Sequence, residues 1–169
     1  MNKLSDWQEI SPFETENSLK LIGKDWMLIT VRDGDKVNAM TASWGCMGVL
    51  WNKPVAVCFI RPQRHTFGLA EAEERFSLCF MEDEYRNALG VCGKLSGRDL
   101  DKLKEAGLSS ENIDGVPVIS EAKMILVCKK LYSDFLKEDA FIDKSLLSNY
   151  TAGDYHKMYV LEIEKVFVK

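Results

Sequence analysis

The sequence predicts a mainly β fold with α insertions, namely an antiparallel barrel or sandwich of about six strands. Three observations support this prediction. Apolar or β-branched runs long enough for strands recur along the chain, and the helical segments between them are short. Strands also do not alternate regularly with long helices, as a doubly wound parallel sheet would require. The length of 169 residues fits one domain, residues 1–169, with a short helical extension over about residues 1–24.

The first elements are a helix and a β hairpin. Ser11-Pro12-Phe13-Glu14 has the form of a capping box, so a short helix is expected from there to about Leu21, closed by Gly23. Two extended stretches that flank a turn signal then predict a hairpin. Its parts are the strand Trp26–Val31, the turn Asp33-Gly34-Asp35 and the strand Val37–Trp44.

The middle of the chain contains the most apolar strand. Val55–Ile60 is continuously apolar and is bounded by prolines, which predicts a strand buried on both faces. The later elements follow from capping residues, glycine stops and β-branched runs. They are a helix over 66–74, a strand over 76–81, a helix capped by Asp83 and ended by Gly93, a helix over 99–106 closed by Gly107, a strand over 122–134, a helical stretch over 139–147 and a strand over 158–168.

Composition and charge argue against several classes of partner and of binding site. The net charge of −4, from 22 basic and 26 acidic residues, argues against nucleic acid or an acidic membrane as a partner. No apolar stretch approaches the roughly 20 residues that span a bilayer, and the N-terminus has no signal-peptide core, so a cytoplasmic protein is expected. The five cysteines are widely spread without a Cys-x-x-Cys pair, and there are two histidines, so neither a disulfide framework nor a metal site is expected.

A first candidate site is Asn38-Ala39-Met40-Thr41-Ala42-Ser43-Trp44-Gly45. Its small side chains leave backbone N–H groups accessible to a flat ligand, and Trp44 could supply an aromatic wall. The alternative is an ordinary hairpin strand with Trp44 in the core.

A second candidate is Arg61-Pro62-Gln63-Arg64-His65-Thr66, directly after the most apolar strand. Two guanidinium groups and a hydroxyl suit a phosphate dianion, because arginine donates two hydrogen bonds in parallel. Thr66 also begins a helical stretch, whose free N–H groups favour an anion. The alternative is a solvated basic turn that pairs with Glu71, Glu73 or Glu74.

Two further residues are candidates. Gly93 and Gly97 flank Lys94 and would permit a close approach of the backbone to a ligand, although a linker between two helices explains them equally. His156 precedes the last strand and could titrate near neutrality as a donor or acid. A loop histidine bonded to the backbone is the alternative.

Taken in order, these segments carry a family resemblance. The stretches are Asn38–Gly45, Lys53-Pro54, Arg61–Thr66, Tyr85–Leu89, Cys92-Gly93, Ser96–Lys102, Gly107-Leu108, Glu121-Ala122 and Asp154–His156. The set resembles the flavin reductase-like family of FMN-binding split barrels, and within it the flavoredoxins. The resemblance extends from about Trp26 to the C-terminus. It implies a six-stranded antiparallel Greek-key split barrel that forms a homodimer and holds FMN noncovalently near the subunit interface.

The resemblance also implies roles for individual residues. The residues that would face the isoalloxazine and ribityl chain are Asn38, Met40, Thr41, Ala42, Ser43 and Trp44. Those that would contact the phosphate and ribityl groups are Arg61, Arg64 and Thr66. Lys94 would be a cation near the flavin, and His156 a polar group beside the flavin or nicotinamide pocket. One departure is Gly153-Asp154-Tyr155-His156, where one reductase branch often has Gly-Asp-His. The inserted Tyr155 bears on whether His156 has the nicotinamide-side role of that branch.

Three functions are compatible with this resemblance. The first is an enzyme in which hydride passes from NAD(P)H to FMN, with no catalytic protein group required beyond a possible role for His156. The second is an electron carrier of the flavoredoxin type that exchanges electrons with a redox protein partner. The third, ranked last, is a relative of pyridoxamine-phosphate oxidase, whose pattern lacks the Ser96–Asp99 stretch.

Overall fold

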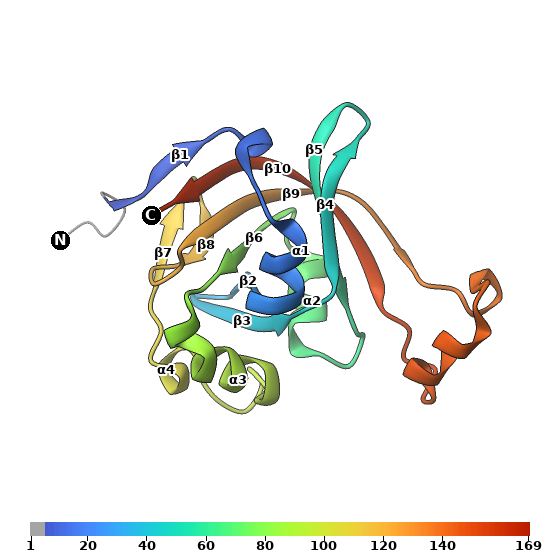
Figure 1. Ribbon diagram of the computed structural model, residues 1–169. Coiled ribbons are helices and arrows are strands. Elements are labelled where there is room, and N and C mark those ends of the chain that lie inside the picture. Colours follow the sequence, from blue (N-terminus) through green and yellow to red (C-terminus); the bar gives the residue numbers. More distant parts are fainter. Residues whose placement is uncertain (1–5) are drawn as a thin grey trace.

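The computed structural model describes residues 6–169, and eight of its strands form one antiparallel sheet (Figure 1). The spatial order is β3-β2-β6-β9-β10-β5-β4, and β1 pairs with β10. The mainly β prediction is confirmed. The strands are β1 (Gln8–Ile10), β2 (Met27–Asp33), β3 (Lys36–Ala42), β4 (Gly45–Leu50), β5 (Lys53–Ile60), β6 (Arg75–Phe80), β9 (Met124–Phe135) and β10 (Lys157–Val168). A separate hairpin joins β7 (Ser110–Ile113) to β8 (Val116–Ile119).

The sheet has more strands than the six predicted, because β1 and β4 belong to it as well. β4 escapes a propensity argument because Gly45 and Gly48 weaken its strand signal. It forms a hairpin with β5 through Trp51 and Asn52, which both have positive φ, as a tight two-residue turn requires.

The barrel remains open between β3 and β4. These two strands are the ends of the sheet order, and no pairing joins them within residues 6–169. Ser43 and Trp44 form the short link across this seam, so the strand predicted to reach Trp44 ends at Ala42. Polar backbone at the seam is therefore left without a neighbouring strand.

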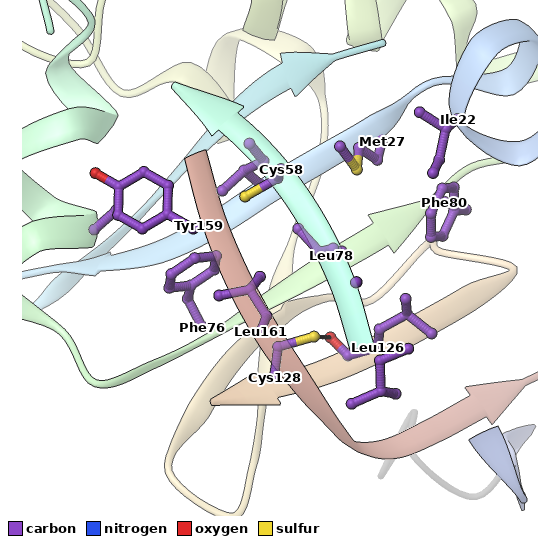
Figure 2. Close-up of a cluster of buried hydrophobic side chains, with 14 of the residues drawn as sticks. Ile22, Met27, Cys58, Phe76, Leu78, Phe80, Leu126, Cys128, Tyr159 and Leu161 are labelled. Carbon is purple, nitrogen blue, oxygen red and sulfur yellow. Dashed lines mark hydrogen bonds between the residues drawn. The ribbon is translucent and has the colours of Figure 1, made fainter. Parts of the chain in front are cut away.

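Both faces of the central strands are buried. Met27 and Ile29 of β2 point into the barrel interior, whereas Leu28 packs on the opposite face under the helices. Figure 2 shows the interior cluster, in which Phe76 and Tyr159 meet edge to face with ring centroids 6.4 Å apart. This double burial explains the continuous apolar runs of the sequence.

The predicted strand Val55–Ile60 forms, but it is not fully buried on both faces as predicted. Ala56, Cys58 and Ile60 are buried in the barrel, but Val57 and Phe59 on the other face are only partly buried. The other face of β5 is thus only partly covered by protein at Phe59.

The N-terminal capping box is confirmed, but it starts a short element. The Ser11 hydroxyl accepts from the Phe13 N–H, and Glu14 accepts from the Ser11 N–H at 2.7 Å. The chain then breaks at Asn17, which has a φ of 55°. The single helix predicted there is three pieces, η2 (Pro12–Glu14), α1 (Ser18–Lys20) and the π-helical turn η3 (Leu21–Asp25). Gly23 lies inside η3 and does not end it.

The remaining helices lie between strands. α2 (His65–Ala72) confirms the predicted helix. Asp83 does not cap its helix but begins the 3-10 turn η4 (Asp83–Tyr85), and α3 (Arg86–Lys94) continues through Gly93. α4 (Lys102–Ala106) starts three residues later than predicted, capped by Asp101, and ends at Gly107 as predicted. The helical stretch after β9 consists of two 3-10 helices, η5 (Glu138–Ala140) and η6 (Lys144–Tyr150). No helix within residues 6–169 has the length and apolarity to span a membrane.

Candidate functional site

A groove lies beside the open seam between β3 and β4. Its cavity measures about 240 Å³ and is bordered by the end of β3, the β3–β4 link, the end of β5 and the segment before β10. The lining residues are Met40, Thr41, Ala42, Ser43, Trp44, Phe59, Arg61, Arg64 and His156. The structure therefore brings together all of the predicted site residues except Asn38, Thr66 and Lys94.

Asn38 and Thr66 support the groove from behind. Both are buried, and the Asn38 amide donates to the Thr66 hydroxyl at 2.8 Å, which ties β3 to the start of α2. Thr41 borders the groove and donates to the carbonyl of Leu89 in α3 at 2.6 Å. These bonds fix the β3 wall against the two helices that flank it.

Lys94 is not brought to the groove of this chain. It is the exposed last residue of α3, and the glycines around it serve packing. A Cβ on Gly93 would lie 3.4 Å from the Thr41 Cβ, and one on Gly97 would lie 2.3 Å from the Asn38 Oδ1. The glycines thus permit close approach to β3, and the linker between α3 and α4 starts after Lys94.

The two arginines have different surroundings. Arg61 donates to the carboxylate of Asp154 and to the carbonyl of Asn149 at 3.0 Å, so it anchors the connection between β9 and β10. Arg64 is different, because its Nη2 is buried and has no hydrogen-bond partner. Burial lowers the pKa of Arg64. The alternative of a solvated basic turn paired with Glu71, Glu73 or Glu74 does not hold, since no ion pair within residues 6–169 joins Arg61 or Arg64 to any of the three.

A second buried cation lies near Arg64 and was not predicted from the sequence. Lys102 is 3% exposed, and its ammonium donates to the carbonyl of Cys92 at 3.2 Å. Burial, together with the charge of Arg64, lowers the pKa of Lys102 to about 8. Within residues 6–169, neither cation pairs with a carboxylate. Arg64 borders the groove, whereas Lys102 borders a separate cavity that Asn38 also lines. The two cations together make a region of positive potential around Arg64 that an anion would stabilise.

Part of the groove lining is aromatic. The His156 ring lies 5.2 Å from the Trp44 ring and 6.3 Å from the Phe59 ring, measured between centroids. Trp44 is 48% exposed, so it forms a wall and not part of the core. Burial, and next to it the charge of Arg61, lowers the pKa of His156 to about 4. The prediction that His156 titrates near neutrality is therefore wrong, and the ring is neutral at pH 7.

The alternative, a loop histidine bonded to the backbone, is not seen either: within residues 6–169, no hydrogen bond joins the His156 ring to a backbone atom. Its Nδ1 lies 2.8 Å from the hydroxyl oxygen of Tyr150. Neither Tyr150 nor Phe59 was a predicted site residue. Phe59 was hidden in a continuous apolar run, and Tyr150 lies in an irregular segment. Lys102 had a signal, because it closes the Ser96–Lys102 stretch of the family resemblance.

A second, larger cavity adjoins the groove. It measures about 450 Å³ and shares Ser43 and Trp44 with the first. Its other lining residues are Ser18, Leu19, Ile22, Gly23, Gly45, Cys46 and Met47, so no charged side chain borders it. Within residues 6–169, no group of three His, Cys, Asp or Glu side chains is arranged to hold a metal ion.

Several solved structures share this fold. An FMN-binding protein from Thermus thermophilus, solved with bound 1-cyclohex-2-enone, is 24% identical over 83% of this chain and 68% of its own, with a TM-score of 0.67. An FMN-binding domain of a flavin reductases-like enzyme from Shewanella baltica is 16% identical over 96% of this chain and 77% of its own, with a TM-score of 0.70. Flavoredoxin of Desulfovibrio vulgaris is 20% identical over 85% of this chain and 69% of its own, with a TM-score of 0.67.

These identities are low, so the solved structures establish the fold alone. No curated protein matches the chain. The family model described as the Flavin reductase like domain, in contrast, matches residues 20–169, which include every element from η3 to β10. The chain belongs to the flavin reductase-like domain family.

Proposed function

We propose that this protein binds FMN noncovalently in the groove at the seam and transfers hydride or electrons between NAD(P)H and the flavin. The observation that carries the proposal is the unpartnered guanidinium nitrogen of Arg64 in a groove that is also lined by aromatic rings. An unsatisfied buried donor is costly, and a phosphate oxygen would satisfy it. A flat ring system would in turn pack against Trp44.

The donor set of the groove fits FMN. Arg64 occupies the N-cap position of α2 without a side-chain capping bond, and the first N–H groups of a helix have no helical acceptor, so this corner would hold the phosphate. The backbone of Thr41–Ser43 and the ring of Trp44 would hold the isoalloxazine. Bound FMN would supply the hydride and electron chemistry, which no protein side chain has to perform. The protein's contribution is to orient the ring and to place polar groups at its edge.

The groove is also small, which supports a site completed by a second copy of the chain. About 240 Å³ is below the roughly 300–1,000 Å³ typical of ligand pockets. Large apolar side chains stand exposed on the β4–β5 hairpin and on the β9–β10 connection, both of which project from the sheet (Figure 1). They are Val49, Leu50, Trp51, Ile142 and Leu146.

Sedimentation equilibrium tests this assembly. We expect a homodimer of twice the chain mass when FMN is bound, because an obligate homodimer would bury these apolar side chains. A monomer that retains FMN with unchanged affinity would rule out a shared site.

The larger cavity supports an oxidoreductase that binds a second ligand next to FMN, in preference to an electron carrier. It shares the Trp44 wall with the groove and has an uncharged lining, which suits a neutral ring such as nicotinamide or a small carbonyl acceptor. The Thermus thermophilus protein holds 1-cyclohex-2-enone, a molecule of this kind. The alternative, an electron carrier with a redox protein partner, has the flavoredoxin likeness in its favour.

Two measurements test the proposal. The purified protein should release FMN on denaturation, and a chain that cannot be loaded with FMN would refute it. Stopped-flow mixing of the loaded protein with NADH and with NADPH should bleach the flavin absorbance. If neither nucleotide bleaches it while a ferredoxin-like donor does, the carrier function replaces the enzyme.

The pH dependence of FMN binding is expected to follow Lys102. Its pKa of about 8 in the free protein should rise when a dianionic phosphate binds beside Arg64. Linkage then requires FMN affinity to fall as the pH rises above about 8, where free Lys102 loses its proton. Flavin fluorescence titrations should show this fall for FMN but not for riboflavin, and Lys102→Met should flatten the FMN curve. An unchanged slope in Lys102→Met would assign the effect to another group.

A further inference from the structure

The hydroxyl of Tyr150 is placed to control the proton of His156. Tyr150 is 7% exposed, and its Oη lies 2.8 Å from the His156 Nδ1, with the two rings edge to face at 5.6 Å. Within residues 6–169, this is the only hydrogen bond of the Tyr150 hydroxyl and the only one of the His156 ring. The pair comes from one short segment, because the two residues are six positions apart.

The direction of this hydrogen bond follows from what each group can donate. The pKa of Tyr150 is raised, first by burial, so the hydroxyl keeps its proton. Among the described residues, Nδ1 is the one acceptor that the Tyr150 hydroxyl contacts, and a buried hydroxyl that did not donate would lose a hydrogen bond. Tyr150 therefore donates and Nδ1 accepts. A neutral imidazole has one N–H, so the proton of His156 is on Nε2.

Nε2 is the nitrogen that remains available to a ligand. It has no partner within residues 6–169, and it is not among the buried polar atoms that lack one. His156 borders the groove next to Trp44 and Phe59. The accessible Nε2–H is therefore a hydrogen-bond donor in the groove, beside the rings of Trp44 and Phe59.

Tyr150 is itself held in place from the sheet. The Arg61 guanidinium lies over its ring at 5.1 Å and also binds the Asn149 carbonyl and the Asp154 carboxylate. On the other side the Tyr155 ring stacks on Tyr150 at 4.9 Å. Arg61 and Asp154 are the charged groups that face His156, and of the two Arg61 has the larger effect, opposing a proton on the ring.

We propose that Tyr150 is a positioning residue that fixes His156 as a neutral imidazole with its Nε2–H directed to a hydrogen-bond acceptor on the ligand. The acceptor class is a carbonyl oxygen or an unprotonated ring nitrogen. That this ligand is FMN rests on the proposed function, whereas the tautomer of His156 does not.

The tautomer can be measured without flavin. The chain has two histidines, so long-range ¹H–¹⁵N correlation spectra of the full-length apoprotein should resolve both rings, with His65 bound to Asp33 as an internal reference. We expect a single Nε2–H tautomer for His156 at neutral pH. A proton on Nδ1, or a charged ring, would overturn the proposal without any variant.

Two matched variants test the role of the hydroxyl. Tyr150→Phe should move the Nδ1 resonance of His156, because that nitrogen loses its donor. Tyr155→Phe, which removes a hydroxyl from the neighbouring stacked ring, should leave the resonance unchanged. If Tyr150→Phe leaves it unchanged as well, the hydroxyl does not position the ring.

Addition of FMN then separates this proposal from the proposed function. FMN should shift the His156 Hε2 signal, and Tyr150→Phe should weaken FMN binding about two- to tenfold, the range for one neutral hydrogen bond. FMN that binds without moving this signal would overturn the ligand contact. No binding of FMN to any variant would instead reject the proposed function and leave the tautomer assignment intact.

Discussion

Arg64→Ala is expected to weaken FMN binding by about ten- to hundredfold while riboflavin binding changes little, because a hydrogen bond to a charged group contributes about 1.5–3 kcal/mol. Riboflavin lacks the phosphate, so it cannot use the unpartnered Nη2 of Arg64. Titration of each flavin by fluorescence quenching, at one fixed salt concentration, measures the ratio directly. Equal weakening of both flavins would remove Arg64 from the phosphate role.

Two other arginines are controls for this result. Arg98 is exposed near the same end of the molecule and donates to the Gln63 carbonyl, so Arg98→Ala removes a positive charge without removing a groove residue. It should leave the FMN to riboflavin ratio unchanged. Arg61→Ala should weaken both flavins alike, because Arg61 holds Asp154 and Asn149 beside His156.

The central strands were predictable because both of their faces are buried. A run such as Met27–Val31 alternates between the barrel interior and the layer under α3, so every residue is buried and all but Thr30 contribute an apolar side chain. β4 lacks this signature because its residues from Gly48 to Leu50 are exposed. The pairing with β5, and not its own sequence, makes it a strand.

The parts of the site formed by consecutive residues were predictable from the sequence. The parts that depend on contacts between distant residues were not. Met40–Trp44 is continuous, and its small polar residues are visible in the sequence. The difference between Arg61 and Arg64 depends on Asp154, which is distant in sequence and pairs with only one of them. Likewise, the Ser96–Lys102 stretch marks Lys102 in the sequence, but the burial of its ammonium beside the Cys92 carbonyl of α3 depends on the fold.

The seam itself depends on one glycine. Gly45 starts β4 immediately after the Trp44 wall, and a Cβ built there would lie 2.5 Å from the backbone oxygen of Val57 and 3.2 Å from the Met27 Cε. The first contact is with the backbone of β5, which cannot rotate away as a side chain can. Gly48, on the same strand, has no atom within 4 Å of the equivalent position.

Gly45→Ala should therefore lower the free energy of unfolding by about 3 kcal/mol, the upper part of the usual cost of overpacking. Gly48→Ala should change it by less than about 0.5 kcal/mol, as for most surface substitutions. Urea denaturation followed by far-UV circular dichroism measures both. Because the strain falls next to Trp44, Gly45→Ala should also weaken riboflavin and FMN equally, unlike Arg64→Ala. Equal stability of the two glycine variants would show that β4 can shift away from β5 at little cost, and that the seam does not require a glycine.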